Sequence, residues 1–136
     1  GSLICRTNSV IRSSLEGMCA RLATENITEE QLEELEENVY LAAFHASKGH
    51  MEQMTELDNR FHHILYDACN SKMLERLLVD FHQYVARIRQ KTLSTKERGI
   101  ASNNEHRQIM EAIKAGNTDK HNIWNVNTEK EYHEPK

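Results

Sequence analysis

The scarcity of helix-breaking residues is the feature that most limits how this chain can fold. Its 136 residues include a single proline, Pro135, and only five glycines. A proline inside a helix removes a hydrogen bond and clashes with the preceding turn, and a glycine there costs about 1 kcal/mol. Long uninterrupted helices are therefore possible along almost the whole chain.

Apolar residues recur with the spacing of amphipathic helices. They repeat at intervals of three and four residues in successive stretches, and no stretch alternates with the period of a strand. Short connections between the stretches favour antiparallel neighbours. We therefore predict an all-α fold, an antiparallel helical bundle of about six helices. The first stripe expected to face the core consists of Ile11, Leu15, Met18 and Leu22. The other stripes lie within Leu32–Ala46, Met54–Ala68, Leu74–Ile88, Ile100–Ile113 and Ile123–Trp124.

Several expected helix ends carry capping residues. Thr28 with Gln31 three residues later is a capping-box pattern, and Gly49 can take the left-handed conformation that ends a helix. The other expected boundaries are Ser71 and Ser94 at helix starts, Gly116 at a helix end, and Asn117 or Thr118 at the start of a sixth helix.

Charge and composition exclude several classes of protein. The formal net charge is −4, with acidic residues concentrated between Glu29 and Glu37, so the chain lacks the basic surface that binds nucleic acid. No apolar run approaches the roughly 20 residues that span a bilayer. The three cysteines are widely spaced and include no CxxC pair, which favours a reducing, cytoplasmic location over a disulfide framework. We expect Cys19 and Cys69 to be small core residues.

Three polar residues fall where the helical pattern predicts burial. Asp58 and His62 are four residues apart, so they share one helix face, which borders the apolar stripe of the third stretch. His106 lies in the apolar register of the fifth stretch, three residues before Ile109. One carboxylate and two imidazoles turned inward from helices suit Zn²⁺, Ni²⁺, Fe²⁺ or Mn²⁺ without choosing among them.

A second interpretation of the same residues stays open, in which they only hydrogen-bond to one another and hold no metal. The other histidines that we considered are interpreted as surface or half-buried side chains without a special role: His45, His50, His82, His121 and His133.

Three segments, in this order, resemble a known family. They are IRSSLEGMCARLA (Ile11–Ala23), ELDNRFHHILYDACNS (Glu56–Ser71) and NEHRQIMEAIKAGN (Asn104–Asn117). The chain resembles the ligand-binding FCD domain that follows the winged helix-turn-helix of GntR-type bacterial regulators of the FadR subfamily. The resemblance runs from about Ile11 to Asn127.

The resemblance implies a metal held by an aspartate and three histidines below a pocket for a small carboxylate. By position, Asp58, His62 and His106 match the aspartate and two of the histidines, whereas Thr128 stands where the third histidine is expected. A carboxylate effector needs a cationic partner, for which an arginine fork is suited. Arg12 is the first candidate and Arg89 the second; a surface ion pair with Glu16 is the alternative for Arg12.

These observations predict an effector-sensing domain in residues 7–136, with residues 1–6 as a tag remnant or linker. DNA would be bound only through a winged helix-turn-helix that is absent from the 136 residues, and the regulator is expected to be a homodimer without enzymatic activity. Two alternatives remain, a metalloenzyme of helical-bundle type and a metal-free ligand-binding or interaction bundle. Against the metalloenzyme, the sequence contains no H-E-x-x-H motif, no paired E-x-x-H motifs and no clear general base.

Overall fold

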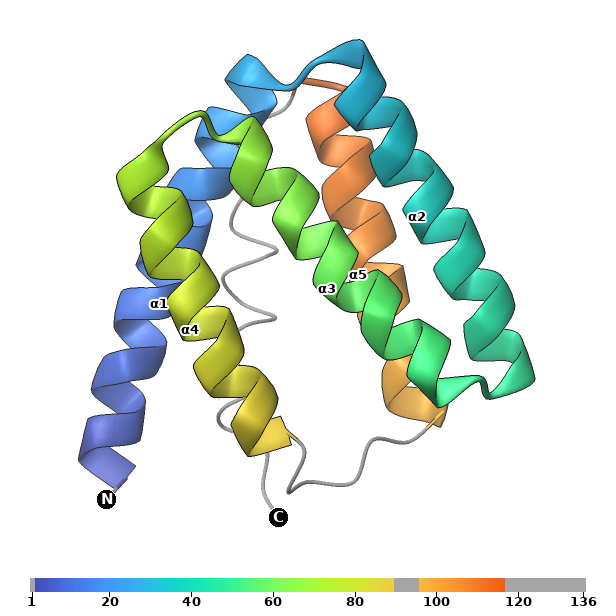
Figure 1. The fold of residues 1–136 in the computed structure, drawn as a ribbon, viewed down its shortest axis with the longest axis horizontal. Helices are drawn as coiled ribbons and strands as arrows, with labels where there is room; N and C mark the ends of the chain where they lie inside the picture. The colour runs from blue at the N-terminus through green and yellow to red at the C-terminus, as the bar shows by residue number, and fades with distance from the viewer. Residues whose placement is uncertain (1, 90–95, 117–136) are drawn as a thin grey trace.

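Five α-helices make up the part of the chain that the computed structural model describes, residues 2–89 and 96–116, and no strand occurs in it. Side chains are described for residues 10–84 and 96–116. The helices are α1 (Ser2–Asn26), α2 (Glu29–Lys48), α3 (Met51–Ala68), α4 (Lys72–Arg89) and α5 (Lys96–Lys114) (Figure 1). The all-α prediction is confirmed. The sixth helix expected around Ile123 and Trp124 lies outside the described residues, as does the expected cap at Ser94.

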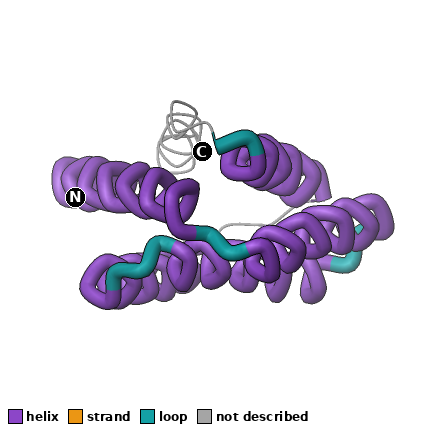
Figure 2. The backbone as a smooth tube through the Cα atoms, turned by 90° about the horizontal axis from the view of Figure 1, so that it is seen from above, coloured by secondary structure: helices purple, strands orange, loops and turns teal. Residues whose placement is uncertain are grey.

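Helix α3 is the centre of the bundle. It packs against each of the other four helices, with α2 on one side and α4 on the other (Figure 1). Helices α1 and α5 lie across the same face of this row, which the view from above shows as two layers (Figure 2). Side chains on the inner face of α3 therefore meet residues from several helices. Within residues 2–89 and 96–116, no helix is long and apolar enough to cross a membrane.

The predicted helix ends are confirmed where the chain is described. Thr28 Oγ1 accepts the backbone N–H of Gln31 at 3.1 Å, and Gln31 Oε1 accepts that of Thr28 at 3.0 Å, which closes the capping box. Gly49 ends α2 with φ 72°, and Gly116 follows α5 with φ 69°. Ser71 Oγ accepts a backbone N–H from the first turn of α4 at 3.3 Å. Each of these ends depends on residues adjacent in sequence, so local chemistry is sufficient to predict it.

The core is mostly apolar, and its buried polar side chains lie on the inner face of α1, at two asparagines and at a cluster of histidines. Cys19 and Cys69 are buried free thiols within it, as predicted. The stripe predicted for the first helix is wrong at Ile11 and Met18, which are 44% and 49% exposed. The inward face is rotated from the predicted one because it includes a buried ion pair as well as small residues. Its buried members are Arg12, Ser13, Glu16, Gly17, Cys19, Ala20 and Ala23.

Two buried asparagines join α2 to its neighbours. Asn38 Nδ2 donates to the carbonyl oxygen of Leu57 on α3 at 2.9 Å. Asn103 Nδ2, on α5, donates to the carbonyl oxygen of Val39 on α2 at 3.2 Å. A buried amide that loses its partner costs about 1–3 kcal/mol, so these bonds favour one register between the helices. The α3 carbonyl involved directly precedes Asp58.

Candidate functional site

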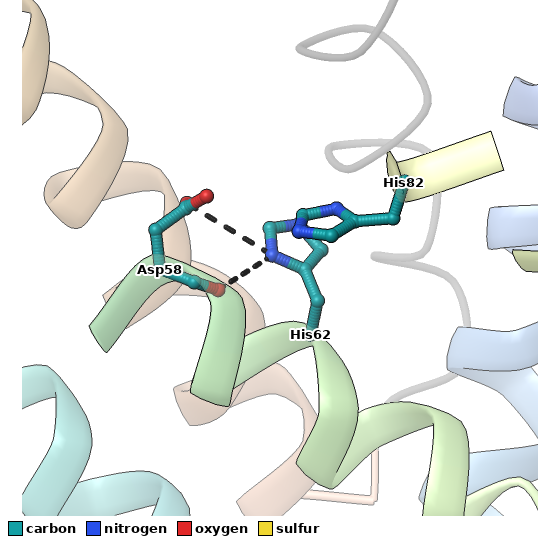
Figure 3. A group of neighbouring side chains, drawn as sticks. All are labelled: Asp58, His62 and His82. Atoms are coloured by element: carbon teal, nitrogen blue, oxygen red, sulfur yellow. Dashed lines mark hydrogen bonds and ion pairs between the residues drawn. The ribbon is translucent and has the colours of Figure 1, made fainter. Parts of the chain in front are cut away.

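Asp58 and His62 lie on one face of α3, one helical turn apart, where α4 and α5 approach it (Figure 3). The His62 side chain is 7% exposed and that of Asp58 is 21% exposed. Their Nδ1 and Oδ1 atoms are 3.9 Å apart. The carboxylate therefore reaches the edge of the core while the imidazole is inside it, as the helical register predicted.

His106 joins this pair from α5. Its Nε2 lies 3.4 Å from Asp58 Oδ1, and the residue is 8% exposed. Its ring stacks on Phe61, with centroids 4.0 Å apart and an interplanar angle of 4°. Phe61 is fully buried, so the stack holds the imidazole against the core. The structure thus brings Asp58, His62 and His106 together from two helices far apart in sequence.

His82 also lies in this cluster, although sequence analysis gave it no special role. It enters from α4, and its ligand atom and those of Asp58 and His62 all lie within 4.8 Å of one another (Figure 3). It is 7% exposed. The sequence contained a signal for the burial of His82: it lies four residues after Leu78 and eight after Leu74, both of which are buried.

Hydrogen bonding fixes which nitrogen of His62 carries the proton. His62 Nδ1 lies 2.8 Å from the carbonyl oxygen of Asp58. A carbonyl oxygen can only accept, so Nδ1 is the donor and the neutral ring has its lone pair on Nε2. Metal-binding histidines typically donate their other ring N–H to a backbone carbonyl or a carboxylate in this way.

His62 is held in the neutral form that a metal requires. Burial lowers the pKa of His62 well below its usual value of 6.5, and the nearby Asp58 carboxylate opposes this shift only in part. At neutral pH the ring therefore has a lone pair available. Metal binding to a histidine that is already neutral does not require the release of a proton.

One pair of donor atoms lies at the separation expected for two ligands of a single first-row divalent ion. Two atoms bound to one ion at about 2.1 Å, at angles of about 90° to 110°, are about 3.0–3.4 Å apart. The 3.4 Å between His106 Nε2 and Asp58 Oδ1 is within this range. Imidazole nitrogens with a carboxylate oxygen are common ligands of Zn²⁺, Ni²⁺, Fe²⁺ and Mn²⁺. The ligand atoms of Asp58, His62 and His82 lie within 4.8 Å of one another, and His106 joins this group through Asp58, so these four residues could hold a metal.

A second polar group lies on the inner face of α1. Arg12 Nε is 2.8 Å from Glu16 Oε1, and their side chains are 4% and 0% exposed. The pairing with Glu16 that the alternative interpretation of the sequence gave is therefore present, but the pair is buried and not at the surface. Both charges act on the buried Tyr66 of α3: burial raises its pKa well above 10, Glu16 raises it further, and Arg12 opposes the rise.

Two buried hydroxyls accompany this ion pair. Among the described residues, the hydroxyls of Ser13 and Tyr66 are buried without a hydrogen-bond partner. The Tyr66 ring is also near the imidazoles, with its centroid 6.1 Å from that of His62 and 6.4 Å from that of His82. Buried polar groups without partners are rare in folded proteins, and they frequently mark a site that a water or ligand completes.

The remaining predicted site residues lie outside the described side chains. Arg89 is the last residue of α4, and its side chain is not among those described. Thr128, His121 and His133 lie beyond residue 116. The positions in the site predicted for Arg89 and Thr128 stay predictions, as does the absence of a special role for His121 and His133.

Comparison with known proteins identifies the family. The profile of the FCD domain family matches residues 9–122. The structure is similar to that of Streptococcus agalactiae GntR, with a TM-score of 0.76 and 23% sequence identity over 94% of this chain and 57% of that one. It is also similar to E. coli McbR/YncC, with a TM-score of 0.78 and 20% identity over 96% of this chain and 63% of that one. At these identities the likeness establishes the fold. No curated protein sequence is significantly similar to the chain.

Proposed function

The chain belongs to the FCD domain family, and we propose that it is the effector-binding domain of a GntR-type transcription regulator. One observation carries the proposal: Asp58, His62 and His106 converge in the bundle, and the buried Tyr66, on which the charge of Arg12 acts, lies next to His62. A small anionic metabolite bound between these groups would contact several helices at once. The domain is thereby suited to report effector binding as a change in helix packing.

A divalent metal is the first part of the proposed site. Asp58, His62 and His106 would hold it, since their donor atoms and the neutral state of His62 suit such an ion. The ion would supply a Lewis-acidic centre that binds an effector oxygen. Zn²⁺, Ni²⁺, Fe²⁺ and Mn²⁺ are the candidates.

A small carboxylate is the second part. Arg12 offers a buried cation, and the hydroxyls of Ser13 and Tyr66 are buried donors without partners among the described residues. A carboxylate accepts hydrogen bonds from all three kinds of group, and bonds to a charged donor are the stronger ones. Tyr66 borders the imidazole cluster, so one small acid can be contacted from both sides.

Regulation would follow from a difference in effector affinity between two arrangements of the helices. The chain spans 57% and 63% of the lengths of the two similar proteins, so we assign DNA binding to a winged helix-turn-helix outside these residues. The whole regulator would act as a cytoplasmic bacterial homodimer without catalysis. Effector binding would change how its two DNA-binding domains are placed.

Thermal melting of the chain tests this proposal. The chelated protein is melted alone, with each of the four metals, and then with a panel of small carboxylic acids in the presence of the best metal. An ion at a hundredfold excess over its Kd should stabilise the fold by about 2.7 kcal/mol, and the matching acid should add to this. Stabilisation by an acid without any metal would support a metal-free effector domain. If neither metal nor acid shifts the melting temperature, the proposal is wrong.

A further inference from the structure

His82 is a buried imidazole beside the predicted metal ligands. Its ring centroid is 4.8 Å from that of His62, and the two rings are inclined by 35°. Its ligand atom lies within 4.8 Å of those of both Asp58 and His62, and the residue is 7% exposed. If His82 served for packing alone, its polar ring would lie against the rings of His62 and Tyr66. A leucine at this position would continue the buried stripe of α4.

A hydrogen bond to Asn59 orients the His82 ring. His82 Nε2 lies 2.8 Å from Asn59 Oδ1. An amide oxygen only accepts, so Nε2 carries the proton, and the neutral ring has its lone pair on Nδ1. The contact is the counterpart of that between His62 Nδ1 and the carbonyl oxygen of Asp58. Neighbouring residues of α3 thus set the tautomers of both rings, as the outer partners of metal-bound histidines do.

We propose that His82 supplies a third imidazole to the metal, so that one ion is held by Asp58 and His62 of α3, His82 of α4 and His106 of α5. This inference rests on the proposed function, since it concerns the same ion. One carboxylate and three imidazoles complete a tetrahedral shell, and a further position opens for an effector oxygen if the ion becomes five-coordinate.

A metal bound by these four residues would connect α4 with α5. Helix α4 packs on α1 and α3 and, within the described part of the chain, makes no contact with α5. An ion bound by both His82 and His106 would therefore link two helices that, in the described part of the chain, are otherwise joined only through α1 and α3. Effector binding at the ion would then act on α4 and α5 together.

The test measures metal affinity of the His82→Ala variant of the full chain by competition with a chromophoric chelator, using Zn²⁺ and Ni²⁺. Loss of an imidazole ligand should weaken binding by at least tenfold, and Asn59→Ala, which frees the ring without removing it, should weaken it by about 10- to 100-fold. The matched control is His63→Ala, which removes an exposed imidazole next to His62 and should leave the affinity unchanged.

The visible spectrum of bound Co²⁺ provides a second readout, because it reports the ligands directly. His82→Ala should alter the absorption bands of the wild-type complex, and His63→Ala should not. Far-UV circular dichroism of the chelated variants establishes that each is folded, and His82→Gln replaces the alanine variant if the latter is not. If the His82 variants bind metal with wild-type affinity and spectrum, this inference fails while the proposed function stands. If the wild-type protein binds no metal, the metal part of both fails.

Discussion

Arg12 Nε lies 2.8 Å from Glu16 Oε1, one turn apart on the inner face of α1, and both side chains are buried. Charges in such a place have lost most of their hydration, and their mutual attraction offsets only part of that cost. The pair occupies space that an apolar stripe would otherwise fill. Its position next to the buried Tyr66 is what connects α1 to the proposed effector site.

Removing one member of this pair should be strongly destabilising. We expect Arg12→Ala to lower the free energy of unfolding by about 3–5 kcal/mol, because the Glu16 carboxylate remains buried without this cation. The double variant Arg12→Met with Glu16→Leu should recover most of the loss, since no buried charge is left. Urea unfolding of the single and double variants measures both effects. Single variants within 1 kcal/mol of the wild type would show that the pair is not buried in solution.

The double variant also separates the two parts of the proposed site. It keeps Asp58, His62 and His106, so a metal should still raise its melting temperature. It lacks the cation, so carboxylic acids that stabilise the wild-type protein should no longer do so. An unchanged response to the acids would remove Arg12 from the effector site.

The stability of the chelated protein should fall as the pH is lowered below about 6.5. Burial holds the pKa of His62 below 6.5 in the folded state, so the unfolded chain binds a proton that the folded chain does not. Where the unfolded state binds more protons, stability rises with pH, by up to about 1.4 kcal/mol per pH unit for one proton. His62→Gln should reduce this slope between pH 6.5 and pH 5, and exposed His63→Gln should not. Equal slopes in wild type and His62→Gln would contradict the burial argument.

The capping box of α2 should contribute measurably to stability. Thr28→Ala removes the oxygen that accepts the Gln31 N–H and is expected to cost about 1 kcal/mol in urea unfolding. Thr55→Ala is the matched control: its hydroxyl only donates to the Met51 carbonyl within α3, and alanine favours a helix interior. It should be neutral or slightly stabilising. If both variants lose the same stability, the cap has no special contribution.

The sequence predicted those features that depend on neighbours along the chain. Capping at Thr28 and Gly49 follows from local backbone geometry, and the inward position of His106 follows from its register with Ile109. The inner face of α1 was not predictable from hydrophobicity, because Arg12 and Glu16 neutralise each other there. Likewise, the proximity of His82 to His62 depends on how α4 packs against α3, which no spacing along the chain specifies.

The two buried thiols differ sharply in how readily they ionise. Cys19 Sγ donates to the carbonyl oxygen of Leu65 at 3.5 Å, and Cys69 Sγ to that of Tyr66 at 3.0 Å, so both lie against the last turn of α3. The adjacent Cys19 thiol lowers the pKa of Cys69 to about 7 despite its burial. The same contact, together with burial, raises the pKa of Cys19 far above its usual value.

This difference predicts a thiolate absorbance change at 240 nm, centred near pH 7, in a Cys5→Ser background. Cys69→Ser should abolish the change because it removes the ionising group. Cys19→Ala should move it to higher pH, since the neighbouring thiol that favours the thiolate is lost while burial still disfavours it. A transition near pH 7 that persists in Cys19→Ala would assign the low pKa to another cause. If the wild-type transition instead lies above pH 8.5, the Cys19 thiol does not favour the Cys69 thiolate in solution.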